Sequence, residues 1–145
     1  IGMMGVEPFL TSSTLLMVVA QRLVRSICKN CKETYEVKPE LMAWLGVSKT
    51  LIENNLKNDK LVLSRGKGCE ACAQTGYKGR MGIHEILEVN DVLRGLIIEK
   101  AHVSKIKEAA RNNGMITLRE SAVRKLFAGA TTVEEVIRVT ASDVD

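Results

Sequence analysis

The cysteines are the residues in this sequence whose type and spacing point most directly to chemistry. All four occur in two Cys-x-x-Cys pairs, Cys28 with Cys31 and Cys69 with Cys72. Two intervening residues let both sulfurs of a turn point at one centre, and two such turns together give the tetrahedral S₄ cage that structural Zn²⁺ takes. Residues 32–68 separate the pairs, which is more than a usual zinc ribbon contains, so we expect a small element inserted between the two turns.

The surroundings of the cysteines agree with a metal site, although the pattern leaves alternatives open. Four thiolates around Zn²⁺ carry a net charge of about −2, which nearby cations offset. Five basic residues are close in sequence: Arg25, Lys29, Lys32, Lys67 and Lys78. The alternatives are two disulfides, a redox pair or an iron–sulfur cluster. Secreted disulfide scaffolds usually contain more cysteine per residue and a redox site needs one pair only, so we favour structural zinc.

Other candidates for catalysis are weak. His84 lies in a predicted strand beside Glu85, and His102 lies at a helix junction, so we interpret both as packing, capping or surface residues. A zinc ion with four cysteine ligands has no open position for an activated water. No G-x-x-x-x-G-K-[ST] segment occurs, so we expect this chain alone not to hydrolyse ATP and we assign no catalytic residue.

Composition predicts a folded chain with a mostly aliphatic core. Of the 145 residues, 46% are hydrophobic and only 3% are aromatic, and the net charge is +4. The basic run from Gly76 to Arg80 lacks the interleaved aromatics of a nucleic-acid stacking platform. The apolar stretch Leu15–Ala20 is too short to span a bilayer. We expect a fragment of a longer protein, located in the cytoplasm because no export signal is visible.

The periodicity and the turn residues predict an α+β fold. Residues 1–10 form a predicted connector, and apolar residues at helical spacing predict a helix over Thr11–Arg25. A helical pair is expected in residues 39–56, with Pro39 in its first turn, Gly46 at a stop and Ser48 as a cap. Strands are expected at Leu61–Ser64 and at Arg80–Val89.

The remainder from Asn90 is predicted to be a bundle of short helices. The expected helix caps are Asn90, Ser104, Thr117 with Glu120, and Thr132 with Glu135. Gly114 and Gly129 are expected to end helices. We therefore divide the chain into residues 1–27 (connector and helix), 28–80 (four-cysteine subdomain with a helical insert and short strands) and 81–145 (strand and helical subdomain).

Several segments, taken in order, resemble one known family. These are MGVEPFL at residues 4–10, AQRLVR at 20–25, the two cysteine pairs, TGYKGR at 75–80 running into GIHE at 82–85, GM-x-TL at 114–118, and TTVEEV at 131–136 with RVT at 138–140. Together they resemble the C-terminal region of type II secretion and type IV pilus-assembly ATPases, over nearly the whole chain. Retraction motors of the same superfamily resemble this pattern less, because they generally lack the four-cysteine insert.

The resemblance implies a C-terminal fragment of a RecA-like, hexameric motor at the cytoplasmic face of the bacterial inner membrane. The full-length motor would use ATP and magnesium and act with inner-membrane platform and cytoplasmic assembly proteins, whereas its Walker motifs match nothing here. The resemblance carries over the metal ligands Cys28, Cys31, Cys69 and Cys72, and it suggests that Arg80 approaches a nucleotide phosphate in the hexamer. Arg22 and Arg25 are weaker candidates for facing the missing core, and for both of them we favour salt bridges or backbone contacts.

Two other functions remain open from the sequence. The segment Cys69-x-x-Cys72-x-Gln74-x-Gly76 distantly resembles the repeats of J-domain chaperones, so a chaperone-like or nucleic-acid-binding zinc module is the alternative. Gln74 departs from that pattern, and only two half-motifs are present where the repeats have four. A free-standing zinc enzyme is disfavoured by the closed ligand set.

Overall fold

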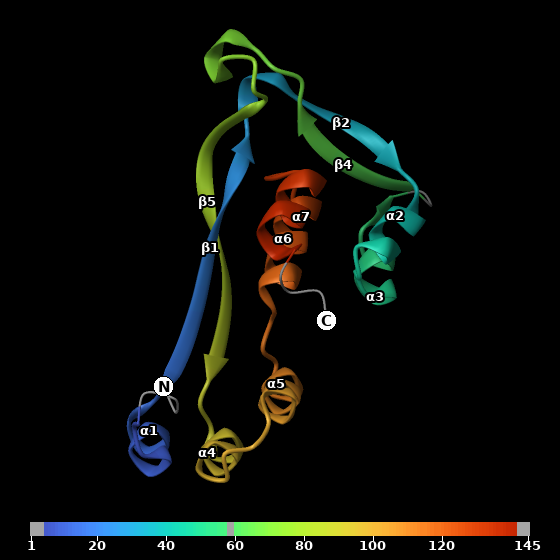
Figure 1. The fold of residues 1–145 in the computed structure, drawn as a ribbon. Helices are drawn as coiled ribbons and strands as arrows, with labels where there is room; N and C mark the ends of the chain where they lie inside the picture. The colour runs from blue at the N-terminus through green and yellow to red at the C-terminus, as the bar shows by residue number, and fades with distance from the viewer. Residues whose placement is uncertain (1–4, 58–59, 142–145) are drawn as a thin grey trace. The chain divides into compact units, whose positions relative to one another are not determined.

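A computed structural model describes residues 5–57 and 60–141, and these form two compact units. Among the described residues, unit 1 comprises residues 5–20 and 84–117, and unit 2 comprises residues 21–57, 60–83 and 118–141. The boundaries after residues 20 and 83 fall within two long strands, β1 (Met17–Ile27) and β5 (Tyr77–Glu88), which pair with each other and point in opposite directions in Figure 1. Each strand therefore contributes residues to both units.

Unit 1 is built from helices together with the N-terminal part of β1 and the C-terminal part of β5. It contains α1 (Pro8–Thr14), α4 (Asp91–Ile98) and α5 (Val103–Asn112), and α4 contacts both of the other helices. Its core consists of Val89, Leu93 and Ala110, with partly buried aliphatic residues packed around them. The predicted cap Asn90 begins α4, because its side chain accepts a hydrogen bond from the Leu93 backbone N–H at 3.0 Å.

Unit 2 contains the cysteines and a three-stranded sheet in the order β2-β4-β3, which is antiparallel throughout. The strands are β2 (Lys32–Val37), β3 (Leu56–Lys57) and β4 (Lys60–Gly66). The predicted helical pair appears as α2 (Pro39–Trp44) and α3 (Lys49–Glu53), with Pro39 in the first turn and Ser48 as N-cap. Each cysteine pair lies on a single 3₁₀ turn, η2 (Lys29–Cys31) or η3 (Glu70–Cys72). The first cysteine of each pair is the N-cap residue of its turn, and the second ends the turn.

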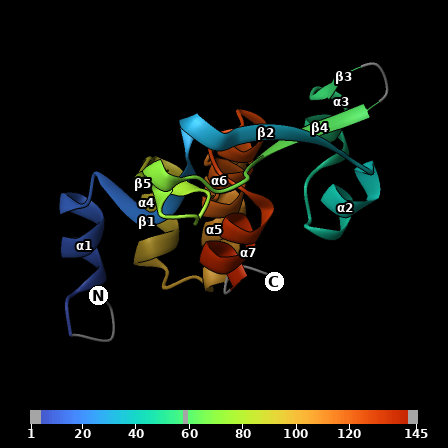
Figure 2. The same cartoon turned by 90° about the horizontal axis from the view of Figure 1, so that it is seen from above.

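The last two helices also belong to unit 2, so the helices after Asn90 do not form one bundle. These are α6 (Leu118–Phe127) and α7 (Val133–Thr140). Figures 1 and 2 show α6 against α7 and beneath β4, in agreement with the contacts between these elements. Buried aliphatic residues of α6 and α7, including Leu126 and Val136, join Leu61 and Leu63 of β4 in the core of unit 2.

The predicted helix over Thr11–Arg25 is wrong. The structure has a seven-residue α1 that begins at Pro8, inside the segment expected to be a connector, and then the strand β1. Leu15 and Val19 gave a helical period, but Val18, Val19 and Val24 are β-branched and favour a strand once a partner is present. Pairing with β5 supplies that partner, and burial alternates along β1 from Ala20 to Arg25.

Candidate metal centre

The first cysteine pair lies on the turn that joins β1 to β2. Cys28 follows the last residue of β1 and is fully buried, and Cys31 ends the 3₁₀ turn η2. The backbone N–H of Cys31 donates to the carbonyl of Cys28 at 3.4 Å, which closes the turn. The two side chains therefore stand on one tight turn, as the two-residue spacing predicts.

The second pair lies on a tighter turn after β4. The Cys72 N–H donates to the Cys69 carbonyl at 3.1 Å, and the Gln74 N–H donates to the same carbonyl at 2.9 Å. Ala73 and Gln74 both adopt positive φ values, 48° and 62°, so the chain reverses here through left-handed backbone. This reversal directs the following residue pair, Thr75 and Gly76, back toward the first turn.

Two backbone pairings bring the turns together. The β2–β4 ladder places Lys32 opposite Gly66, and just beyond it the Lys67 N–H donates to the Cys31 carbonyl at 3.0 Å. The Cys28 N–H donates to the Gly76 carbonyl at 2.9 Å. Only glycine fits where these segments touch, because a Cβ on Gly66 would lie 2.0 Å from the Gly76 carbonyl oxygen.

The four sulfurs form a compact cluster, and all of them lie within 4.8 Å of one another. The Sγ–Sγ distances are 3.9 Å for Cys28–Cys69, 3.8 Å for Cys31–Cys72 and 3.7 Å for Cys69–Cys72. A disulfide needs about 2.05 Å, and all four cysteines are free in the structure. A tetrahedral Zn–S₄ site with bonds of about 2.3 Å has edges of about 3.8 Å, which matches these distances.

Backbone N–H groups aim at the sulfurs. Gly68 donates to Cys31 Sγ at 3.3 Å, Cys69 donates to Cys72 Sγ at 3.2 Å, and Gly76 donates to Cys72 Sγ at 3.3 Å. Such donors stabilise thiolates, which are the metal-binding form of cysteine. Gly76 has a double role, because its N–H donates to the second turn and its carbonyl accepts from the first.

The thiols differ in acidity according to these contacts. Burial raises the pKa of Cys31 to about 12, assisted by its thiol neighbours and opposed by the Gly68 N–H. For Cys72 burial also acts to raise the pKa, but the N–H groups of Cys69 and Gly76 outweigh it and lower the pKa to about 6. The Cys72 thiol is therefore more readily deprotonated than the Cys31 thiol, and a cation bound by all four sulfurs would favour the thiolate form of each.

This donor set fits a tetrahedral, sulfur-preferring divalent ion. Four cysteine sulfurs at the vertices leave no position for water, so the centre suits a structural role and not hydrolysis. The structure thus brings together all four cysteines that the sequence suggested as ligands.

A buried ion-pair cluster lies next to the centre, and the sequence analysis missed it. The side chain of Glu135 is fully buried and accepts from the backbone N–H of Arg25 at 2.7 Å and from its Nε at 2.9 Å. Arg138 donates through Nε at 2.8 Å and through a terminal nitrogen at 2.7 Å. Burial acts to raise the pKa of Glu135, but these arginine contacts outweigh it and lower the pKa to about 2.

Tyr77 connects this cluster to the second cysteine turn. Its ring lies under the Arg25 guanidinium, 4.1 Å from ring centroid to Cζ, and its hydroxyl is 2.8 Å from Thr132 Oγ1. Thr132 is the N-cap of α7 and accepts from the Glu135 N–H at 3.4 Å, as predicted. The sequence showed Glu135 only as the third residue of a capping box, so its partnership with Arg25, far away in the chain, gave no local signal.

The other candidate residues have the following places. Arg22 donates to the backbone carbonyl of Val139, as the backbone-contact alternative predicted. Arg80 is exposed on β5 and makes no ion pair with any residue in the described ranges. His84 is exposed, whereas His102 is the N-cap of α5 and its Nδ1 accepts from the Ser104 N–H at 3.3 Å. The prediction that Ser104 is this cap is therefore wrong by two residues, because the imidazole takes the role of the shorter side chain.

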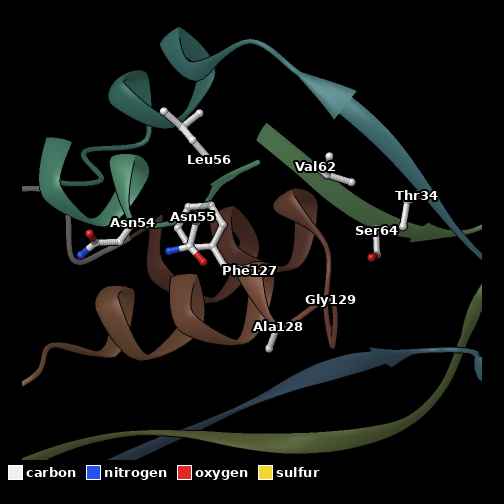
Figure 3. A pocket seen from close by; sticks show the side chains of 9 residues that line it. All are labelled: Thr34, Asn54, Asn55, Leu56, Val62, Ser64, Phe127, Ala128 and Gly129. Atoms are coloured by element: carbon white, nitrogen blue, oxygen red, sulfur yellow. The ribbon is translucent and has the colours of Figure 1, made fainter. Parts of the chain in front are cut away.

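A separate pocket of about 290 Å³ lies between the β2–β4 pair, the end of α3 and the end of α6 (Figure 3). Its lining combines the hydroxyls of Thr34 and Ser64 and two amides with the Phe127 ring and aliphatic groups. Among the described residues, its lining contains no acidic, basic or thiol side chain, so these residues offer no metal ligand set and no general acid or base.

Comparison with known proteins decides the family. The family model for type II/IV secretion system proteins matches residues 1–138. The chain belongs to the type II/IV secretion system protein family. Family membership agrees with the resemblance seen in the sequence, and it comes from a match over nearly the whole chain.

Named relatives of this family come from both pilus and secretion systems. The chain is 46% identical to the type IV pilus assembly ATPase PilB of Thermus thermophilus, over 92% of this chain and 14% of that protein. It is 42% identical to the type II secretion system protein E of Pseudomonas aeruginosa, over 94% of this chain and 26% of that protein. The identity is also 42% to the type II secretion system ATPase E of Vibrio cholerae, over 94% of this chain and 25% of that protein.

The chain therefore spans about a quarter or less of the length of these relatives. Within the described residues, none of the helices has the length and apolar character that crossing a membrane requires.

Proposed function

We propose that this chain is a structural zinc-binding part of an ATPase that powers type II secretion or type IV pilus assembly. The observation that carries the zinc assignment is the four-sulfur cluster, in which three of the Sγ–Sγ distances, at 3.7–3.9 Å, match the edge of a tetrahedral Zn–S₄ site. The ATPase assignment rests on relatives at 42–46% identity whose names state that activity. Both the secretion branch and the pilus branch occur among these relatives.

Zinc in this site would supply folding free energy to unit 2. The two cysteine turns have few buried apolar residues of their own, so a metal that binds both turns stabilises them directly. Binding of structural zinc contributes on the order of 10 kcal/mol in small modules. Cys28, Cys31, Cys69 and Cys72 would hold the ion, and the N–H groups of Gly68 and Gly76 would orient the sulfurs of Cys31 and Cys72.

The nucleotide chemistry of the proposed motor belongs to other parts of the full-length protein. The printed sequence contains no phosphate-binding loop, so ATP and magnesium would be held by the remainder of the ATPase core. We place Arg80 at the edge of that site in a homo-hexamer, as a contact to a nucleotide phosphate. Its exposure and its lack of an ion-pair partner among the described residues support this role. Membrane platform proteins at the inner face of the inner membrane would be the partners of the motor.

Metal analysis of the 145-residue chain, purified without chelators, tests the zinc proposal. We expect one zinc per chain by mass spectrometry of the metals. Cys69→Ser should lower the zinc content strongly and destabilise unit 2, whereas Ala71→Ser introduces the same side chain at an exposed position between the cysteines and should keep the metal. Hydrogen exchange at the amides of α6 and α7, which belong to unit 2, follows unfolding of that unit.

Unit 1 provides an internal control in the same sample. Its helices α4 and α5 should keep their hydrogen-exchange protection in Cys69→Ser, because none of the cysteines lies in unit 1. A wild-type chain without tightly bound metal, or one that holds iron, would contradict the zinc assignment.

A further inference from the structure

One pocket of unit 2 takes no part in the metal centre or in the ion-pair cluster. It is the pocket of about 290 Å³ shown in Figure 3, and we call it the hydroxyl pocket. One side of it is the β2–β4 ladder, in which Thr34 pairs with Ser64, so their two hydroxyls stand next to each other on one face. The end of α6 contributes Phe127, and the turn after α3 contributes Asn54.

The polar groups of the hydroxyl pocket lie at its two ends. Figure 3 shows the Asn54 amide at one end and the hydroxyls of Thr34 and Ser64 at the other, with the Phe127 ring between them. The described residues that line the pocket include no charged side chain, so a charged ligand would lose hydration there without gaining a lining ion-pair partner. The pocket therefore suits an uncharged ligand with an apolar middle and a polar group at each end.

The Ser64 hydroxyl is the group of this pocket that most needs a ligand. Ser64 is 5% exposed, and its hydroxyl has no hydrogen-bond partner among the described residues. Every fully buried polar side-chain atom in the described residues has such a partner, so the Ser64 oxygen must be reached by solvent, and the pocket is where it is reached. A ligand that enters the pocket displaces this solvent and has to replace its hydrogen bond.

Gly129 leaves the room that this hydroxyl requires. A Cβ at Gly129 would lie 2.7 Å from Ser64 Oγ and 2.7 Å from Lys32 Nζ. The exposed Lys32 ammonium thus lies beside the C-terminal end of α6, where it complements the negative end of the helix dipole. An oxygen of a ligand placed next to Ser64 would accept a hydrogen bond in these surroundings.

A tyrosine residue within a peptide has the order of groups that the hydroxyl pocket matches. Its phenolic hydroxyl can accept from Ser64 and donate to Thr34 Oγ1, its ring can pack on Phe127, and its backbone amide can bond to the Asn54 amide. Tyrosine is uncharged at neutral pH and is enriched among the residues that dominate protein interfaces. A purely apolar side chain would leave the Ser64 hydroxyl unpaired.

This chain does not itself supply such a tyrosine. It contains only Tyr35 and Tyr77, and both are partly buried. The Tyr77 hydroxyl is 2.8 Å from Thr132 Oγ1, and the Tyr35 ring centroid is 5.2 Å from Arg65 Cζ. Both side chains are engaged within unit 2, so a second copy of the chain is not the occupant.

We propose that the hydroxyl pocket binds a tyrosine of a partner protein, with Ser64 and Thr34 as hydrogen-bond partners of the phenol and Phe127 as the surface on which its ring packs. This site is separate from the metal centre. The inference goes beyond the proposed function, and it rests neither on the identity of the metal nor on the ATPase assignment.

Nuclear magnetic resonance titration of the 145-residue chain with N-acetyl-tyrosine amide tests the proposal. We expect saturable shifts of the amide signals of residues 62–64 and 127–129, with a dissociation constant of roughly 1 mM for a ligand of this size. N-acetyl-phenylalanine amide lacks only the hydroxyl and should bind about fivefold more weakly. N-acetyl-glutamate amide should not bind, because no described lining residue is basic.

Three variants assign the preference for tyrosine to the hydroxyls. Ser64→Ala removes no hydrogen bond between described residues, and it should bind the tyrosine and phenylalanine derivatives equally. Thr34→Val keeps the shape of an exposed side chain and should also reduce the preference, so the test stands even if Ser64→Ala does not fold. Thr50→Ala, at an exposed position of α3 outside the pocket, should keep the fivefold preference.

Several results would overturn the proposal. These are the absence of saturable shifts, equal affinity of the wild type for the tyrosine and phenylalanine derivatives, and tighter binding of the glutamate derivative. A preference that persists in both Ser64→Ala and Thr34→Val, or that Thr50→Ala abolishes as well, would also contradict it. Stronger shifts of the same signals with methyl glucoside would assign the pocket to a sugar instead. Metal analysis of the same samples keeps this result separate from the zinc proposal.

Discussion

Replacing Glu135 by Gln tests how much the buried ion-pair cluster contributes to the stability of unit 2. The substitution keeps the size of the side chain and removes its charge, so both Arg25 and Arg138 lose their carboxylate partner. The new amide also presents an N–H group to two cations that can only donate. Neighbouring Glu134 is exposed in the same first turn of α7, which makes Glu134→Gln a matched control for the effect on the helix dipole.

The size of the effect follows from the acidity of Glu135. Its arginine contacts lower the pKa from 4.5 to about 2, and each pKa unit corresponds to about 1.4 kcal/mol. The shift alone would give about 3 kcal/mol, and solvent reduces this because the two arginine side chains are half exposed. We therefore expect Glu135→Gln to lower the free energy of unfolding by about 2 kcal/mol at pH 7, and Glu134→Gln by about 0.5 kcal/mol.

The sign of the pH dependence provides a second check. The folded-state pKa lies below the unfolded value, so the unfolded chain binds more protons and the contribution is fully present above about pH 5. It is lost as the pH falls from about 4.5 toward about 2. The difference between wild type and Glu135→Gln should therefore shrink when both are unfolded at progressively lower pH.

Urea unfolding followed by hydrogen exchange at the amides of α6 and α7 measures this quantity for unit 2. Wild type, Glu135→Gln and Glu134→Gln are compared at each pH with equal metal content. If the two variants differ by less than about 0.5 kcal/mol at pH 7, or if their difference grows on acidification, the ion pairs do not stabilise unit 2 as reasoned here.

Two glycine pairs give further predictions. Gly76→Ala should destabilise unit 2 by about 2–4 kcal/mol and weaken metal binding, because φ is +76° and the new Cβ would lie 2.5 Å from the Gly66 carbonyl oxygen. Gly79 also has a positive φ, +84°, but a Cβ there would meet nothing within 4 Å, so Gly79→Ala should lower the free energy of unfolding by only about 1 kcal/mol in urea. Equal losses of stability in Gly76→Ala and Gly79→Ala would refute the steric argument. In unit 1, Gly95→Ala lies within α4 with open space around it and should stabilise that helix by about 1 kcal/mol. Gly114→Ala, at a φ of +89°, should instead destabilise unit 1 by a similar amount in hydrogen exchange.

Features encoded by adjacent residues were predictable from the sequence. The spacing in each cysteine pair predicted two turns, and the structure brings their sulfurs together. Caps such as Ser48, Asn90 and Thr132 were predictable because one side chain satisfies an N–H group two or three residues away. The strand expected at Arg80–Val89 lies almost wholly within β5, since its alternation is visible along the chain.

Features that depend on distant partners were not predictable in this way. The apolar residues of β1 match a helix as well as a strand, and only pairing with β5 decides between the two. Glu135 and Arg25 are separated by 110 residues, so no local pattern marks their contact. The burial of the Glu135 carboxylate was not predictable either, because a glutamate in the first turn of a helix is ordinarily exposed and acts as a capping residue.

The distance between the cysteine pairs in the sequence matters less than the register of the strands between them. The ladder from Lys32–Gly66 to Val37–Leu61 pairs the first and last parts of residues 32–66 as antiparallel strands. The elements α2, α3 and β3 lie between these two strands in the sequence. The first cysteine turn ends immediately before Lys32 and the second begins three residues after Gly66, so a longer or shorter insert leaves the sulfurs in place as long as that rung is kept. A slip by one residue would move one turn about 3.3 Å along the strand and turn alternate side chains to the opposite face. The close contact of Gly66 with Gly76 prevents such a slip, because a residue with a Cβ brought to either position would overlap the opposing backbone. The two glycines therefore fix the register that brings the four sulfurs to one point, and the paired spacing of the cysteines is useful only because that register holds.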